Sequence, residues 1–305
     1  MQRGIAPPSW FGYKPHGGHR LELPCLWFIK FCRVLGLAPL SLRNAEVLDT
    51  SVQWRRYTMA LVSLSGVLIA FFIASTFPFK HIDSFLLRLN AILQLFATAV
   101  CQCVAVFFDQ SLAYLFNKAS LKYAYARDLD LALRGLVIGI TITSSLMVIN
   151  QIVGALYGYV DVQAGIAYVL ADVVGMHIPF VFEVIFIMCV LDAGKNVLIL
   201  NAEIGGPVNG MTNVGWKQRT RFWERYSEIF DYVGCLNSIF GLPILLNLLN
   251  VFFQCLRGLF MFLVYGISFY VVLWALKSVL STFRVVSILT ACVYTEKAVS
   301  LVVSR

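Results

Sequence analysis

The apolar stretch from residue 164 to residue 191 contains three ionisable side chains, Asp172, His177 and Glu183. A charged group at the centre of a bilayer costs at least about 2.5 kcal/mol unless it is paired or hydrated. We therefore expect these side chains to face a bundle interior or water. Asp172 and His177 point roughly 140° apart around a helix, so they do not form an acid–base pair. Interhelical hydrogen bonds, a solvated ligand cavity open to the outside and a proton relay remain alternative roles.

Polar and aromatic residues at a similar depth on other apolar stretches extend this group. Aromatic walls accommodate the apolar parts of small ligands, and amides orient their hydroxyl groups, so the pattern predicts an outward-facing pocket. This prediction uses only the depth of each residue along its stretch. The candidate pocket residues are Gln94, Asn150, Gln151, Asp172, His177, Gln254, Tyr265 and Phe269, with Tyr157 and Tyr270 nearby.

The residues that usually carry catalysis or bind metals form no recognisable motif. The chain has four histidines, and it contains no HExxH, GxSxG or CxxC pattern. The eight cysteines lie in apolar stretches or beside basic segments, and only Cys255 approaches the opposite side. No disulfide framework is therefore predicted. We expect a protein that is not an enzyme and that uses no metal and no cofactor.

The composition requires a membrane environment. The chain is 59% hydrophobic and only 13% charged, with a mean hydropathy of +0.79, whereas soluble domains are about 25% charged. Windows of about 20 residues predict six transmembrane helices in an all-α polytopic bundle. The predicted spans are Thr58–Phe79, Phe85–Phe108, Gly135–Tyr157, Ala164–Leu191, Leu236–Leu256 and Leu259–Ser281.

The positions of the basic residues predict the orientation of this bundle. All but three of the 24 Lys and Arg residues lie at the ends of the chain or on alternate connections, and the exceptions are Lys80, Arg88 and Arg257. Basic segments stay in the cytoplasm, so both termini are predicted to be cytoplasmic in a multi-pass protein of the plasma membrane. The net charge of +8 is spread over four segments, and we expect no nucleic-acid binding.

The predicted spans and orientation divide the chain into three parts. Residues 1–57 form a cytoplasmic segment without a cleavable signal and with an interfacial or bundle-packed helix near Cys25–Leu42. Residues 58–283 form the six-helix bundle, and residues 284–305 form a cytoplasmic tail. In the second span, Asn90, Gln94 and Gln102 are four and eight residues apart and are predicted to form a polar stripe that faces the bundle. A helix starting in Lys217–Arg225 is predicted to continue into the fifth span.

The segment YSEIFDYVGCLNSIFGLPILLNLLNVFFQCLRGLFMFLVY, residues 226–265, contains an Asn-x-x-Phe-Gly pattern at Asn237, Phe240 and Gly241 that leads into a leucine-rich run. This segment resembles the region before and within the fifth span of insect gustatory receptors. KFCRVLGLAPLSL before the first span is similar to the leader of that family, and the final CVYTEKAVSLVVSR is similar to its last cytoplasmic loop. The layout agrees over most of the chain, and the specific likeness is confined to these patches.

The resemblance implies a ligand-gated cation channel subunit with seven spans and a cytoplasmic N-terminus, which detects small-molecule tastants such as sugars or bitter compounds. Family members form homo- or hetero-tetramers around a pore lined by the last helix. The Thr-Tyr-to-Gln-Phe motif of that helix is not found before Arg305, so we expect this chain to join full-length subunits. The alternative is a six-span transporter or channel of another family, although Pro179 and Pro243 do not occupy matching places in two halves.

Overall fold

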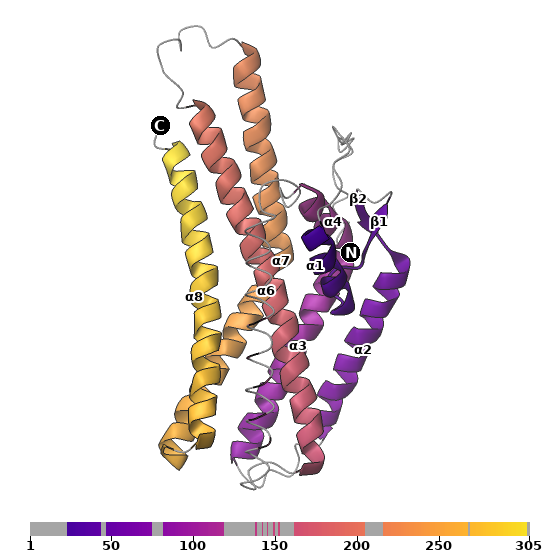
Figure 1. Ribbon diagram of the computed structural model, residues 1–305, viewed down its shortest axis with the longest axis vertical. Coiled ribbons are helices and arrows are strands. Elements are labelled where there is room, and N and C mark those ends of the chain that lie inside the picture. Colours follow the sequence, from indigo (N-terminus) through magenta and orange to yellow (C-terminus); the bar gives the residue numbers. More distant parts are fainter. Residues whose placement is uncertain are drawn as a thin grey trace, which may run out of the picture.

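The computed structural model describes residues 23–43, 47–74, 82–118, 162–204, 216–267 and 269–303, with five isolated positions between 138 and 152. Long helices run side by side along the longest axis of the molecule, and a smaller group of short elements lies beside them (Figure 1). The described elements are α1 (Leu23–Val34), β1 (Leu40–Arg43), β2 (Val47–Thr50), α2 (Val52–Ala74), α3 (Ile82–Phe107), α4 (Asp109–Lys118), α6 (Val162–Ile204), α7 (Trp216–Tyr265) and α8 (Phe269–Val303).

Five described helices contain a segment long and apolar enough to cross a membrane. These segments are Val52–Ala74, Arg88–Phe107, Val174–Leu200, Trp223–Val264 and Trp274–Lys297. A helix satisfies its own backbone hydrogen bonds, which is the condition for crossing lipid. The chain is therefore a multi-pass bundle of membrane helices. The predicted third span, Gly135–Tyr157, lies outside the described residues apart from isolated positions.

The predicted boundary between the fifth and sixth spans is wrong. We placed it at Arg257, but α7 continues through this residue to Tyr265 and the chain reverses at Gly266, whose φ of 62° suits a residue without a side chain. Arg257 lies inside α7, and its guanidinium is 3.8 Å from the centre of the Trp274 ring. The predicted sixth span, Leu259–Ser281, is consequently divided between α7 and α8.

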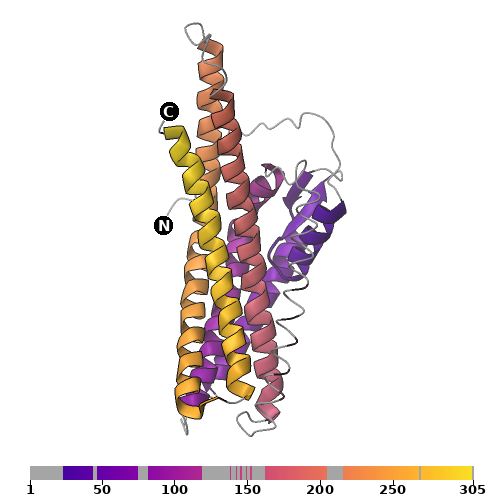
Figure 2. The ribbon, with the colours of Figure 1, turned by 60° about the vertical axis from the view of Figure 1, so that its left-hand side comes forward.

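The helices also extend beyond the predicted spans at one end. α8 continues to Val303, so most of the predicted tail, 284–305, is helical. α6 runs on to Ile204 beyond its predicted end at Leu191. The prediction of a helix that starts in Lys217–Arg225 and enters the fifth span is confirmed by α7. Together, α6 and α7 project past the other elements at the upper end of the molecule (Figures 1 and 2).

Two apolar clusters fill the bundle, and we name them for their positions in Figure 1. In the upper cluster, side chains of α1, β1, β2, α3 and α4 pack against α6, α7 and α8, and Phe182 and Phe240 are among its fully buried members. Their ring centroids are 4.7 Å apart. The lower cluster joins α2, α3, α6, α7 and α8 and consists of Phe72, Ala91, Leu95, Ala171, Met261, Val271 and Trp274.

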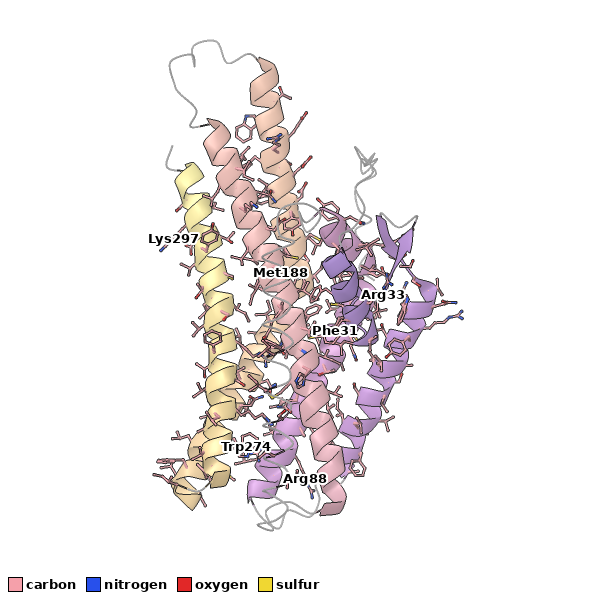
Figure 3. The ribbon with its side chains drawn as sticks, viewed as in Figure 1. Phe31, Arg33, Arg88, Met188, Trp274 and Lys297 are labelled. Atoms are coloured by element: carbon pink, nitrogen blue, oxygen red, sulfur yellow. The ribbon has the colours of Figure 1, made fainter. Side chains whose placement is uncertain are left out.

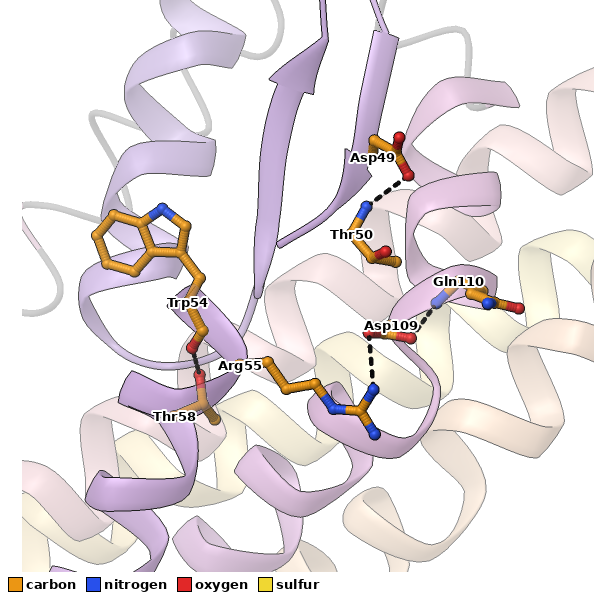
Figure 4. A network of polar contacts seen from close by, with 7 residues as sticks. All are labelled: Asp49, Thr50, Trp54, Arg55, Thr58, Asp109 and Gln110. Carbon is orange, nitrogen blue, oxygen red and sulfur yellow. Dashed lines mark hydrogen bonds and ion pairs between the residues drawn. The ribbon is translucent and has the colours of Figure 1, made fainter. Parts of the chain in front are cut away.

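A small antiparallel hairpin departs from the all-α prediction. In it, β1 pairs with β2 in the register Leu40 to Thr50. The amide of Asn117 on α4 bonds both backbone groups of Leu48, because its Oδ1 accepts from the Leu48 N–H at 3.0 Å and its Nδ2 donates to the Leu48 carbonyl at 2.8 Å. Beside the hairpin, Arg55 of α2 lies 3.9 Å from the Asp109 carboxylate of α4 (Figure 4). These contacts hold the N-terminal elements against the bundle.

Candidate functional site: a buried polar layer

Buried polar side chains lie on α3, α6, α7 and α8, and we call them together the polar layer. α3 contributes one continuous stripe to it. The stripe consists of Asn90, Gln94, Thr98 and Gln102, each no more than 3% exposed. The spacing of four residues places all of them on one face. The prediction that Asn90, Gln94 and Gln102 face the bundle is therefore confirmed, and Thr98 was overlooked.

Gln94 packs directly against α6, because α6 has a glycine at the facing position. A Cβ added to Gly175 would lie 2.7 Å from the Cβ of Gln94, closer than side chains approach one another. Close helix approach through small residues is a common packing mode in membranes. At the upper end of the stripe, the Gln102 Nε2 donates to the carbonyl of Leu35, which follows α1, at 3.0 Å.

An ion pair joins α6 and α8 inside the bundle. The Nε of Arg284 donates to the Oε2 of Glu183 at 2.8 Å, and the two side chains are 12% and 4% exposed. The Arg284 guanidinium also lies 5.1 Å from the centre of the Phe180 ring. Pairing with an opposite charge lowers the cost of burying a carboxylate in the membrane. From the sequence, Glu183 is expected to be paired or hydrated, and Arg284 is its partner. Its partner was missed because Arg284 was assigned to a cytoplasmic tail.

The largest group of buried polar residues lies on α7 and α8. On α7 they follow a spacing of three or four residues and consist of Asn247, Asn250, Gln254 and Arg257, all at most 6% exposed. On α8, Lys277 and Ser281 are likewise buried. The Ser281 hydroxyl donates to the Oε1 of Gln254 at 2.8 Å and links the two helices. The stripe on α7 therefore faces α8 within the bundle.

Two cations contact a single indole at the lower edge of this layer. Trp274 is fully buried, with the Arg257 guanidinium 3.8 Å and the Lys277 ammonium 4.5 Å from its ring centroid. Figure 3 shows Trp274 at the lower end of the bundle, pointing inward from α8. A desolvated cation over an aromatic face gains about 2 kcal/mol. The attraction of the ring thus offsets part of the hydration free energy that both cations lose on burial.

Several buried polar atoms of the layer have no hydrogen-bond partner within the described residues. They include Asn90 Oδ1, Gln94 Oε1 and Nε2, Gln254 Nε2 and Trp274 Nε1. Leaving such an atom unpaired costs about 1–3 kcal/mol. The layer therefore combines anchored groups, such as Glu183 with Arg284, with donors and acceptors that no described residue bonds.

Three of the predicted pocket residues, Gln94, His177 and Gln254, are buried. Asp172 lies on α6, Tyr265 ends α7 and Phe269 begins α8, but the side chains of these three lie outside the described residues, as does Tyr270. Asn150, Gln151 and Tyr157 also fall outside the described part of the chain. Arg257, Lys277 and Arg284 were missed, although their spacing of three or four residues from other polar residues would have indicated them.

A separate pocket of about 230 Å³ lies at the upper ends of α6 and α7. Its polar lining includes Asp192, whose carboxylate accepts from the Asn196 amide at 3.3 Å. The full lining comprises Asp192, Ala193, Asn196, Ile199, Leu200, Arg225, Glu228, Ile229 and Tyr232. This place differs from the predicted one at the opposite, outward end. Within the described ranges, no group of three or more His, Cys, Asp or Glu side chains could hold a metal ion.

No family model matches this chain, and no curated protein matches it. The resemblance of residues 226–265 to gustatory receptors therefore stays a prediction.

Proposed function

We propose that the chain is a small-molecule chemoreceptor subunit of the gustatory receptor type in the plasma membrane. The observation that carries the proposal is the buried polar layer on α3, α6, α7 and α8, in which individual amide and indole atoms have no hydrogen-bond partner among the described residues. Polar groups inside membrane bundles are expensive and are typically kept for function. A tastant with hydroxyl or carbonyl groups and an apolar body fits such a lining.

The chemistry of the layer supports binding in preference to catalysis. Gln94 and Gln254 offer neutral amides, and Trp274 offers an indole N–H, which orient a ligand without transferring protons to it. The carboxylate of Glu183 is engaged by Arg284 at 2.8 Å. In the proposed receptor these helices form the ligand-sensing part of a cation channel, assembled as a homo- or hetero-tetramer as the resemblance implies.

The proposed orientation places both termini in the cytoplasm. α1, the hairpin, α4 and the C-terminal end of α8 all lie toward the upper part of the bundle, on the side to which α6 and α7 project (Figures 1 and 2). The turn between α7 and α8 lies at the opposite end. Arg33 and Lys297 lie toward the upper side (Figure 3), as the charge pattern predicts. Lys277, which the charge pattern counted on the same side, lies instead 4.5 Å from the Trp274 ring toward the lower end.

Ligand binding to the purified chain tests the proposal directly. The chain in lipid nanodiscs would be screened for ligand-induced thermal stabilisation across a panel of sugars and bitter compounds. For any compound that binds, Gln94→Leu and Gln254→Leu should raise the Kd about tenfold or more, because each leaves a ligand polar group unpaired. Gln110→Leu, which changes an exposed amide on α4 outside the layer, is the matched control and should leave the Kd unchanged.

Two results would count against the proposal. If Gln110→Leu weakens binding as much as the layer variants do, the polar layer is not the site. If proteoliposomes containing the chain accumulate a substrate against its gradient, the transporter reading takes precedence. Co-expression with full-length receptor subunits, followed by whole-cell recording, tests the channel part of the proposal separately from binding.

A further inference from the structure

The C-terminal half of α1 has an exposed face that combines cations with apolar side chains. Lys30 is exposed and Arg33 partly exposed, and between and beside them Phe31 and Val34 are 37% and 59% exposed. The opposite face of the helix is buried in the upper cluster and consists of Phe28, Ile29 and Cys32. An amphipathic helix with cations and aromatics on its open face is typical of segments that lie in a membrane interface.

The end of α1 is fixed against the first turns of α2. Gly36 has a φ of 73°, its N–H donates to the Arg33 carbonyl at 2.9 Å, and the Leu37 N–H donates to the Cys32 carbonyl at 2.8 Å. This is the Schellman pattern of a helix end, in which cations near the last turn are favoured by the helix dipole. The Tyr57 hydroxyl of α2 donates to the Val34 carbonyl at 2.9 Å. The exposed face of α1 therefore holds a fixed position beside the start of α2.

Two N–H donors of Arg33, on the same edge of its guanidinium, have no hydrogen-bond partner in the described structure. Its Nε and Nη2 are buried and have no hydrogen-bond partner in the described part of the chain. These two nitrogens form one edge of the guanidinium, where the N–H bonds are parallel and match two oxygens of a phosphate or carboxylate. The Trp54 ring lies 6.0 Å from the guanidinium carbon and gives only weak compensation. Burial accordingly lowers the pKa of Arg33 from its ordinary value, because desolvation disfavours the charged form.

We propose that Arg33, with Lys30 and the neighbouring rings of Trp54 and Tyr57, binds the phosphate of an anionic phospholipid. The apolar segment of α2 begins at Val52, so this face lies at the depth where a membrane helix enters the lipid. Trp and Tyr favour that level, and clustered cations there attract anionic headgroups. A lipid also explains the exposed Phe31, which inserts into the acyl boundary, whereas a free anion leaves it in water. Figure 3 shows Phe31 and Arg33 on α1 beside α2.

Lipid titration tests this proposal on the full chain. Purified protein in phosphatidylcholine nanodiscs would receive increasing phosphatidic acid, and bound phosphatidic acid would be counted by native mass spectrometry. We expect Arg33→Gln to raise the apparent Kd about tenfold, since one interfacial cation with a bidentate contact contributes that order of affinity. Arg33→Lys, which keeps the charge and loses the paired donors, should lie between this variant and the wild type.

A matched control is Lys297→Gln, which removes an exposed cation of α8 far along the chain from α1. It should bind phosphatidic acid as the wild type does. The proposal fails if Arg33→Gln also binds like the wild type, or if Lys297→Gln loses as much affinity as Arg33→Gln. Inorganic phosphate provides a further arm. If it displaces phosphatidic acid at equal concentration, the site binds a free anion and the lipid assignment is wrong.

Trp54 supplies a second readout that does not depend on affinity. The fluorescence of Trp54 is the part of the emission that is lost in Trp54→Phe. Phosphatidic acid brominated on its acyl chains should quench this Trp54 fluorescence more strongly than brominated phosphatidylcholine does. In Arg33→Gln this excess should disappear, while quenching by brominated phosphatidylcholine stays at its wild-type value and shows that the variant is folded and inserted. Persistence of the excess in Arg33→Gln would overturn the proposal.

Discussion

The ion pair between Glu183 and Arg284 should make a measurable contribution to the stability of the bundle. The two residues lie 101 positions apart in the sequence and join α6 to α8 through an N–O distance of 2.8 Å. Removal of one partner leaves an uncompensated buried charge, which costs about 3–5 kcal/mol. Replacement of both partners by apolar residues of similar size removes both desolvation penalties and is often neutral or stabilising.

These two expectations define a double-mutant cycle. We expect Glu183→Leu and Arg284→Met each to lower the free energy of unfolding by about 3–5 kcal/mol, because each leaves the opposite charge buried without its partner. Glu183→Gln should cost less than Arg284→Met, since its amide oxygen still accepts a hydrogen bond from the guanidinium. The double variant Glu183→Leu with Arg284→Met should be close to the wild type.

Unfolding by SDS in mixed micelles, followed by circular dichroism, measures these differences. Lys297→Met, which alters an exposed cation on the same helix, should change the free energy by less than about 0.5 kcal/mol. The reasoning is refuted if Arg284→Met is as stable as the Lys297 control. It is also refuted if the double variant loses the sum of the single losses, because the two charges would then act independently.

Three further predictions use the same unfolding assay or simple labelling. Gly175→Ala places a methyl group 2.7 Å from the Cβ of Gln94 and should destabilise by about 1–3 kcal/mol; Gly66→Ala, with nothing within 4 Å, should be neutral or stabilising, and equal effects would contradict the packing argument. Trp274→Leu removes the ring that faces two cations at 3.8 and 4.5 Å and should cost more than Trp274→Phe, which retains a weaker aromatic face; equal losses would assign the effect to volume alone. Epitope tags at the two ends of the chain should stain only after permeabilisation, and staining of either tag on intact cells would reverse the proposed orientation.

The sequence was informative wherever a helix is apolar and its polar residues keep a helical spacing. Asn90, Gln94 and Gln102 were placed on the buried face of α3 from their spacing alone, and each is at most 3% exposed. The long apolar runs likewise predicted the helices that could cross a membrane. Both predictions depend on local chemistry, because hydropathy and period are set by neighbours along the chain.

The N-terminal hairpin could not be predicted in the same way. Its strands are four residues each, too short for an alternating pattern to be distinguished from chance. Its anchor is Asn117, which bonds Leu48 across 69 residues of sequence. This contact forms only when α4 packs against β2. The residues near Leu48 in the sequence therefore do not predict the strand, because the residue that bonds it is distant along the chain.

Arg257 shows how the same rule fails when charge is given priority over spacing. A lone arginine between two apolar runs predicts an outer loop, and this places the turn nine residues before Gly266, where the chain reverses. Yet Asn247, Asn250, Gln254 and Arg257 keep the three- and four-residue steps that identified the stripe on α3. A charged residue can occupy such a stripe when the neighbouring helix places an aromatic ring or a counter-ion against it, as α8 does here with Trp274. Periodicity therefore identifies the buried polar face of a membrane helix. Whether a charged residue is tolerated on that face depends on its partner on another helix, and the sequence of one helix does not contain that partner.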